Sequence, residues 1–251
     1  MKKIKAMLML IVAVPTLFGL PEGISRALVR SDEPEGIVLD DYTKGLSSKW
    51  QEKSFQGQTE YRVTRENGRL CVRASSHGSA SGLYYKVKYD LEEYPILTWE
   101  WKVENVLAHG DALHKEGDDY AARVYVIFPS WLFWRTKALN YIWANKLPKG
   151  KAVRNAFVKN AVMIAVESGP GMAGQWLTET RNVLEDYRQQ FGEDPPEVGA
   201  IAIMTDTDNT DGNAVAWYGV IRIRSSKSVA RSHRELRLSY PSSAVLANDK
   251  L

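Results

Sequence analysis

The chain has 251 residues, of which 44% are hydrophobic, and a formal net charge of +3. That length is sufficient for one sizeable core, and we expect a single domain. The positive charge is confined to the two ends, because residues 21 to 221 carry a net charge of −5. A nucleic-acid-binding domain needs a basic face on its folded body, so this distribution excludes nucleic acid as the expected partner.

The amino terminus has the pattern of a secretory signal. Lys2, Lys3 and Lys5 precede the uncharged run AMLMLIVAVPTLFGL. This run is shorter than the roughly 20 residues that a membrane-spanning helix needs. We therefore expect residues 1–23 to be a signal peptide, with an uncleaved anchor as the alternative, and the protein to be periplasmic or secreted.

Cys71 is the only cysteine of the chain, and it lies far from the signal in the segment RLCVRA. A disulfide within the chain and a lipid-modified cysteine at the end of the signal are therefore both excluded. We predict a buried thiol within a strand.

A β-hairpin begins the predicted strands of the body, which we place at residues 38–224. Segments 60–65 and 69–74 flank Asn67-Gly68, a pair that tolerates the positive φ values of a tight turn. Residues 83–91 and 97–103 follow with strict alternation of apolar and polar residues, which is typical of half-buried strands. In the second segment Leu97, Trp99, Trp101 and Val103 share one face.

Four later segments are apolar on both faces, as expected of central strands that are covered on both sides. They are residues 122–128, 161–168, 198–205 and 214–223. One helix is expected between the second and third of them. Asn182 can cap it with Glu185 three positions later, and Gly192 can end it. The sequence thus predicts an all-β fold, an antiparallel, jelly-roll-like β-sandwich with one short helix.

Several long motifs, in their order and spacing, resemble the exported bacterial family called domain of unknown function 3047. They are SGLYYKVKYDLEEYPILTWEWKV, GDDYAARVYVIF, ALNYIWAN, RNVLEDYRQQFGEDPPEVGAIAIMTDTDNT and AWYGVIRI, and the resemblance runs from about Val38 to Ile223. It implies no activity, since that of the family is unknown. At the level of architecture, the opening LDDY and the closing strand after an acidic loop are similar to jelly-roll carbohydrate-binding and galactose-binding-like domains.

An acidic cluster directly follows the predicted strand 198–205. It contains Asp206, Asp208, Asn209 and Asp211. The spacing is not that of an EF-hand, because Thr210 stands at the fifth position and no glutamate at the twelfth. Such residues also form ordinary turns, since their side chains bond to the local backbone.

A second acidic cluster, Glu116, Asp118 and Asp119, precedes strand 122–128. If that strand runs antiparallel to 198–205, the two clusters share a rim, where repelling carboxylates require a proton, a cation or a basic side chain. Arg123 is the expected neutralising side chain.

Three outcomes remain open at this rim. The first is a cation site, with calcium held by Asp206 and Asp208 and with Asp118 and Asp119 as further ligands. The second is a glycosidase, with two carboxyl groups roughly 5 to 9.5 Å apart. The third is a network of aspartate and arginine that fixes two loops.

Aromatic residues are concentrated in an expected insertion between two central strands, WLFWRTKALNYIWANK. Trp131, Trp134, Tyr141 and Trp143 could form a surface that stacks on sugar rings or rests at a lipid interface, or they could simply pack together. Basic residues 225–251 are expected to form a partly disordered tail, which with the amino-terminal segment could contact membranes peripherally.

These features favour noncatalytic binding of a glycan or another envelope polymer. Calcium could assist this binding. A glycoside hydrolase or lyase that uses the carboxylates of the rim is one alternative, and an envelope scaffold protein is another.

Overall fold

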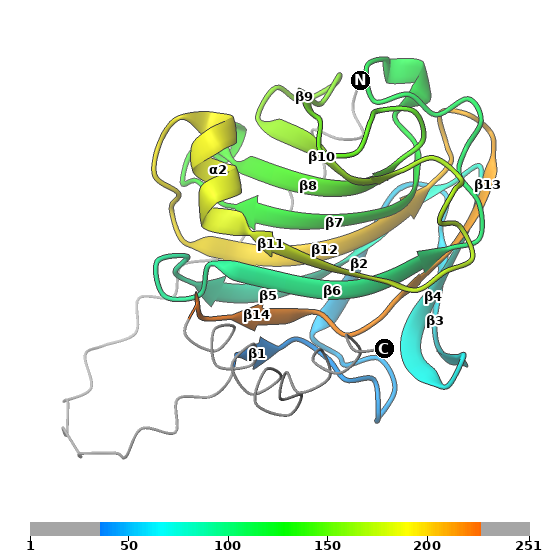
Figure 1. Cartoon of the computed structure of the whole chain (residues 1–251), viewed down its shortest axis with the longest axis horizontal. Coiled ribbons are helices and arrows are strands. Elements are labelled where there is room, and N and C mark those ends of the chain that lie inside the picture. The colour runs from blue at the N-terminus through cyan, green and yellow to red at the C-terminus, as the bar shows by residue number, and fades with distance from the viewer. Residues whose placement is uncertain (1–35, 227–251) are drawn as a thin grey trace, which may run out of the picture.

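The computed structural model describes residues 36–226, which form two β-sheets packed face to face, with one α-helix beside them (Figure 1). The all-β sandwich expected from the sequence is confirmed. The predicted signal at 1–23 and almost all of the predicted tail at 225–251 lie outside the described residues. Within residues 36–226, no helix has the length and the apolar character needed to cross a membrane.

The first sheet has seven strands. β3, β4, β13, β6 and β11 lie side by side in that order. β14 pairs with the same edge of β6 as β13 does, next to β13 along that edge. β1 pairs with the outer edge of β14. The strands are β1 (Ile37–Val38), β3 (Glu60–Glu66), β4 (Arg69–His77), β6 (Ile96–Val103), β11 (Leu177–Asn182), β13 (Asn213–Tyr218) and β14 (Arg222–Arg224).

The second sheet also has seven strands, in the order β2-β5-β12-β7-β8-β10-β9. They are β2 (Trp50–Gln56), β5 (Ala80–Tyr89), β7 (Tyr120–Phe128), β8 (Lys137–Ala144), β9 (Ala152–Arg154), β10 (Ala161–Ser168) and β12 (Val198–Asp206). All neighbours are antiparallel except β8 and β10, which run parallel.

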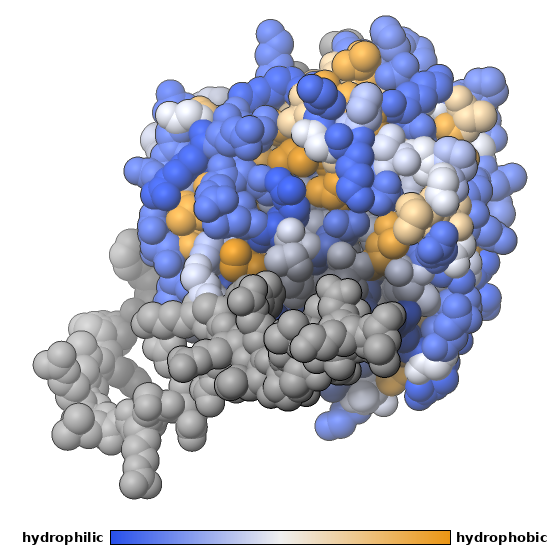
Figure 2. Space-filling view, viewed as in Figure 1, coloured by the Kyte–Doolittle hydropathy of each residue, from blue (hydrophilic) through white to orange (hydrophobic). Residues whose placement is uncertain are grey.

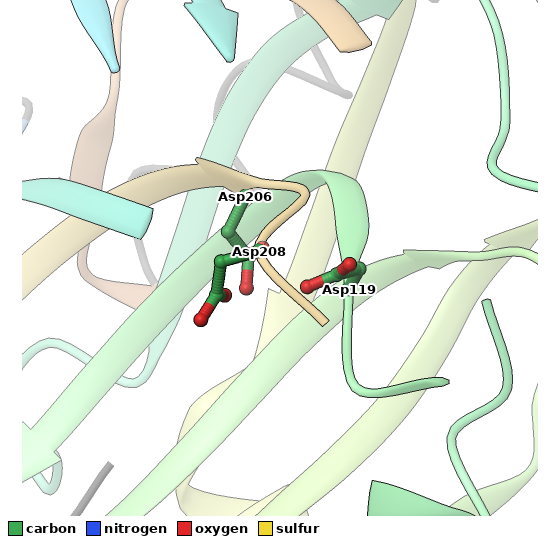
Figure 3. A group of neighbouring side chains, drawn as sticks. All are labelled: Asp119, Asp206 and Asp208. Atoms are coloured by element: carbon green, nitrogen blue, oxygen red, sulfur yellow. The ribbon is translucent and has the colours of Figure 1, made fainter. Parts of the chain in front are cut away.

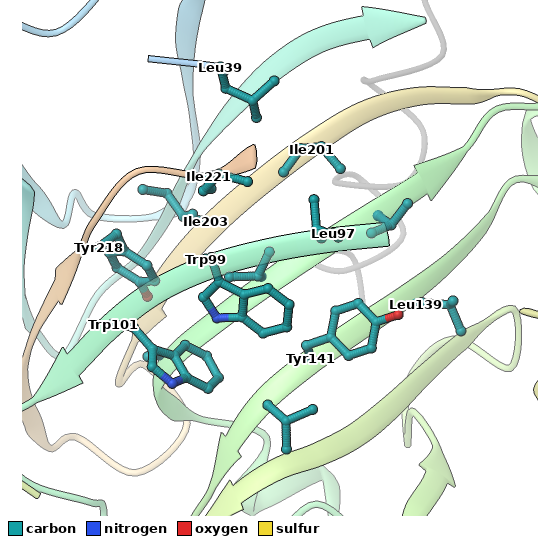
Figure 4. Packing of buried hydrophobic residues seen from close by; sticks show 14 of the residues in the cluster. Leu39, Leu97, Trp99, Trp101, Leu139, Tyr141, Ile201, Ile203, Tyr218 and Ile221 are labelled. Atoms are coloured by element: carbon teal, nitrogen blue, oxygen red, sulfur yellow. The ribbon is translucent and has the colours of Figure 1, made fainter. Parts of the chain in front are cut away.

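The core lies between the two sheets and is rich in aromatic rings (Figure 4). The predicted apolar face of β6 is fully buried, and its Trp99 stacks on Tyr141 of β8 with ring centroids 5.2 Å apart. Trp101 contacts Trp143 of β8 with the two rings tilted at 54° and their centroids 5.7 Å apart. Each ring pair stabilises the fold by about 0.5–1.5 kcal/mol beyond the contribution of the apolar area that it buries. The contacts between β6 and β8 therefore hold the two sheets together.

The predicted hairpin is confirmed. It joins β3 to β4, and both turn residues have positive φ, 50° at Asn67 and 81° at Gly68. Cys71 on β4 is buried, and desolvation raises the pKa of its thiol to about 11. The thiol is therefore protonated at neutral pH and inert.

The predicted helix is α2 (Val183–Phe191). Asn182 caps it through a hydrogen bond that its side chain accepts from the amide of Glu185 (3.2 Å), and Gly192 ends it with φ of 72°. Tyr187 packs against Phe128 of β7 at 4.6 Å between ring centroids. The helix therefore lies beside the end of β7, where it forms one wall of the groove described below.

Two expectations about the strands were wrong. The apolar run 214–223 is not one strand, because Gly219 interrupts it where the backbone approaches Glu100 too closely for a side chain. The aromatic segment after β7 is not wholly an insertion, because its second half forms the central strand β8. Leu139, Tyr141 and Trp143 alternate toward the core there, but Ile142 between the last two is apolar and buried as well, which weakens the period-two pattern.

The surface on the side seen in Figure 2 has only small apolar patches, separated by hydrophilic residues. Scattered apolar residues of this kind are normal for a protein surface and indicate no binding site.

Candidate functional site

The two acidic clusters meet at one end of the second sheet. β12 and β7 are antiparallel neighbours, and their register places Asp206 opposite Tyr120 and Met204 opposite Arg123. The end of one strand thus lies beside the start of the other. We call Asp118, Asp119, Arg123, Asp206 and Asp208 the acidic corner.

Arg123 is the cation of this corner, and its side chain is only 2% exposed. Its Nε donates a hydrogen bond to Asp206 Oδ1 (2.9 Å), and its Nη2 forms an ion pair with the other oxygen of Asp206. Nη1 lies 3.9 Å from Asp118 Oδ1. The guanidinium also lies 4.7 Å from the centroid of the Tyr120 ring. One arginine therefore links the start of β7 to the end of β12.

Asp119 holds the loop that follows β12. Its carboxylate accepts hydrogen bonds from the amides of Asn209 and Thr210 (3.0 and 2.7 Å), from the Thr210 hydroxyl (2.7 Å) and from the Asn209 side chain (3.2 Å). The asparagine and threonine of the acidic motif thus serve as donors to a carboxylate 90 positions away in the sequence.

Asp118 fixes a third segment. Asn155 donates its side-chain amide to both oxygens of Asp118, at 3.0 and 3.1 Å, and its own oxygen accepts from the amides of Phe157 and Val158. Burial is the largest influence on Asp118 and raises the pKa of its carboxyl group, although Arg123 acts in the opposite direction.

This pKa makes a specific pH dependence expected. The pKa of Asp118 is higher in the folded protein than in the unfolded chain, so the folded protein binds this proton more tightly. At pH values below the ordinary pKa, the bound proton contributes its full stabilisation of the folded state. This contribution is lost as the pH rises through the raised pKa. The free energy of unfolding of the native protein should therefore decline, relative to that of Asp118→Asn, as the pH rises from about 4 toward 7. Urea unfolding of both proteins across this range measures the difference, and parallel curves would contradict the assignment.

Three aspartates of the corner could hold a metal ion. One carboxylate oxygen each of Asp119, Asp206 and Asp208 lies within 4.8 Å of the other two, and the three side chains approach one another from the ends of β7 and β12 (Figure 3). No other such group occurs among residues 36–226. Asp119 already accepts hydrogen bonds from the loop after β12, and Asp206 already pairs with Arg123, so a metal ion would share these two carboxylates with protein groups.

Two acidic residues singled out in the sequence lie outside this corner. Asp211 and Glu116 are exposed and line a shallow hollow of about 430 Å³, together with His109, His114 and Lys146. Asp211 has a positive φ of 49°, as turn residues do. Its place in the acidic motif therefore reflects the geometry of the turn.

Two of the four residues of the expected aromatic surface are buried, and the other two are exposed. Tyr141 and Trp143 are fully buried on β8, so they are not part of any surface, and the expectation was wrong for these two. The residues before β8 behave in the opposite way, because Trp131 is 90% exposed, Trp134 is 59% exposed and Phe133 is 40% exposed. They lie in the loop that contains the short 3-10 helix Phe133–Arg135.

A groove of about 510 Å³ opens beside Trp131. The end of β7, this loop, the start of β8 and the region around α2 form its walls. The lining residues are Phe128, Pro129, Ser130, Trp131, Arg135, Lys137, Asn160, Tyr187, Glu193 and Pro196. Sequence reasoning missed Asn160, Tyr187 and Glu193 as groove residues, since they come from separate segments and share no motif.

The groove combines aromatic and hydrogen-bonding side chains. Lys137 Nζ donates to Glu193 Oε1 at 2.6 Å, and the hydroxyl of Tyr187 donates to the same oxygen at 3.1 Å. Lys137 also lies over the rings of Phe191 and Tyr187. These contacts fix the charged side chains of one wall, and they lower the pKa of Glu193, with the hydrogen bond from Lys137 as the main cause.

The sequence matches the model of one protein family over residues 48–222, more than two thirds of the chain. This family is described as a protein of unknown function, DUF3047. The chain belongs to this family. The resemblance read from the motifs is thus confirmed, and the family description assigns no activity. No protein with a curated description matches the chain.

Solved structures with a similar fold share little sequence with this chain. The K3 cleaved adhesin domain of Lys-gingipain from Porphyromonas gingivalis W83 is 12% identical, with a TM-score of 0.39 over 75% of this chain and 98% of that one. The CBM22-1 xylan-binding domain from Paenibacillus barcinonensis Xyn10C is 10% identical, with a TM-score of 0.36 over 76% of this chain and 97% of that one. The beta-1,2-glucanase from Parabacteroides distasonis is 10% identical, with a TM-score of 0.42 over 77% of this chain and 26% of that one.

These likenesses are distant. They include carbohydrate-binding modules, one of them described as belonging to the β-sandwich superfamily. At TM-scores this low, they carry no argument about what this chain binds.

Proposed function

We propose that this protein binds a glycan of the cell envelope at the groove beside Trp131, without cleaving it. The observation that carries the proposal is the 90% exposure of Trp131 at a groove that also contains hydrogen-bonding side chains. An indole left in water gains by stacking on the apolar face of a sugar ring, and nearby amides and charged groups can bond to the sugar hydroxyls. The signal-like amino terminus supports export to the compartment where such polymers occur.

The positions of the carboxylates favour binding over hydrolysis. Glycoside hydrolysis requires two carboxyl groups that reach the same bond. In the acidic corner, Asp118, Asp119 and Asp206 are at most 2% exposed, and each has protein partners. In the groove, Glu193 is the one carboxylate among the described lining residues, and Lys137 and Tyr187 occupy one of its oxygens.

The test is binding to a panel of soluble xylan, mannan, β-glucan, peptidoglycan fragments and uronate polymers, measured by calorimetry. We expect at least one to bind the native protein, and Trp131→Ala to weaken that binding at least about tenfold, since an aromatic anchor at the centre of an interface contributes on the order of 2 kcal/mol. Trp134→Ala is the matched control, because Trp134 is also exposed but does not line the groove. Binding of no polymer, or equal binding by Trp131→Ala, would contradict the proposal.

The proposal also includes calcium, which would bind at the acidic corner and assist the binding of the glycan. Carboxylate oxygens suit this hard cation, and one oxygen each of Asp119, Asp206 and Asp208 lies within 4.8 Å of the other two. The same panel is therefore measured with calcium and with a chelator, together with the melting temperature. A rise in melting temperature that Asp208→Asn removes would support calcium binding, whereas an unchanged melting temperature would exclude calcium and leave the glycan proposal intact.

A further inference from the structure

Two of the charged side chains in the groove form an ion pair with each other, and the third does not. Arg135, Lys137 and Glu193 are its three charged lining residues. Lys137 and Glu193 form an ion pair at 2.6 Å, so their charges cancel locally. The guanidinium of Arg135 has no partner among residues 36–226 and is exposed beside Trp131. The groove therefore presents one uncompensated positive charge.

The loop that carries Arg135 is held in place by hydrogen bonds. The amide of Arg135 donates to the carbonyl of Leu132 (2.7 Å), and the side chain of Asn160 donates to the carbonyl of Trp134 (2.7 Å). The amide of Leu132 donates to the Ser130 hydroxyl, and the amide of Ser130 donates to the Thr136 hydroxyl. Trp131 and Arg135 thus project from one fixed turn, so a ligand meets them with little loss of backbone entropy.

We propose that the groove selects an acidic glycan, and that Arg135 binds the carboxylate of a uronic acid residue while Trp131 stacks on a sugar ring. This inference rests on the proposed function and specifies its ligand. A planar guanidinium matches a carboxylate through two parallel hydrogen bonds, which gives geometric selectivity as well as attraction. The ion pair of Lys137 with Glu193 leaves Arg135 as the group that distinguishes an acidic sugar from a neutral one.

The experiment compares oligosaccharides of galacturonate, glucuronate and mannuronate with their methyl esters, which keep the sugar ring but remove the charge. The native protein should bind at least one acid form about tenfold more tightly than its ester, as expected for a hydrogen bond to a charged group. Arg135→Gln should bind acid and ester equally. Lys146→Gln, which removes an exposed positive charge outside the groove, should keep the native preference.

Each other outcome is decisive. Equal binding of acid and ester by the native protein would overturn the acidic selectivity and leave the glycan proposal standing. A preference for the acid form that persists in Arg135→Gln would overturn the role of Arg135. Tighter binding of polyphosphate than of every uronate would show a phosphate ligand and contradict the inference. If no acidic or neutral polysaccharide binds at all, the proposed function itself fails.

Discussion

Replacing Arg123 by methionine is expected to lower the free energy of unfolding by about 3–5 kcal/mol, because removal of one partner from a buried ion pair leaves the other charge buried without compensation. Asp206 would lose its ion pair with Arg123, and Asp118 would lose the guanidinium that lies 3.9 Å from its Oδ1. The link between β7 and β12 would be weakened at the same time. Urea unfolding followed by circular dichroism measures the effect.

Lys88→Met is the matched control for this prediction. Lys88 pairs with Glu197 at 2.7 Å, but both side chains are largely exposed, and exposed pairs contribute about 0–1 kcal/mol. Equal losses in the two variants would contradict a structural role for Arg123. A native-like Arg123→Met would indicate that the corner does not need its arginine.

Replacing Trp99 by alanine is expected to cost about 3–5 kcal/mol, because the change removes a large fully buried side chain and leaves a cavity. It also removes the stacking on Tyr141 and the edge contact with Trp101, both of which lie between the two sheets. Trp134→Ala removes the same side chain from an exposed position and should change stability by about 0.5 kcal/mol or less. Similar losses for both tryptophans would contradict the placement of the core.

Alternation of side chains, the Asn67-Gly68 turn and the apolar runs together predicted the sandwich and more than half of its strands. β6, the hairpin at Asn67-Gly68 and the cap of α2 at Asn182 follow from local patterns, and the structure confirms them. β8 escaped prediction because it lies within the aromatic-rich segment after β7 and is buried on both faces, so Ala138, Ile142 and Ala144 weaken the alternation. β11 escaped because it is a short, polar strand at the edge of its sheet.

The acidic corner could be anticipated in part. The sequence places carboxylates at the ends of two strands, and the antiparallel pairing of β7 with β12 then brings them together. Local reasoning did not reveal that Asn209 and Thr210 donate to Asp119, or that Asn155 donates to Asp118, because these bonds join distant segments. For the same reason the groove was recognisable only at Trp131, since its other walls come from α2 and from the loop before β10.

The two regions therefore have different roles in this account. In the acidic corner, each buried carboxylate already has a partner within the protein, and the corner joins β7, β12 and the loop around Asn155. In the groove, an exposed indole and an unpaired guanidinium have no partner among the described residues. Unsatisfied groups at a groove, rather than satisfied ones in a core, are where a ligand gains free energy.

The most direct test of this account is hydrogen–deuterium exchange with and without the oligosaccharide that the native protein binds most tightly. We expect slower exchange in segments 128–137 and 187–196, which contain most of the residues that line the groove, and no change at 118–123 and 205–211. Protection confined to the segments of the acidic corner would contradict it.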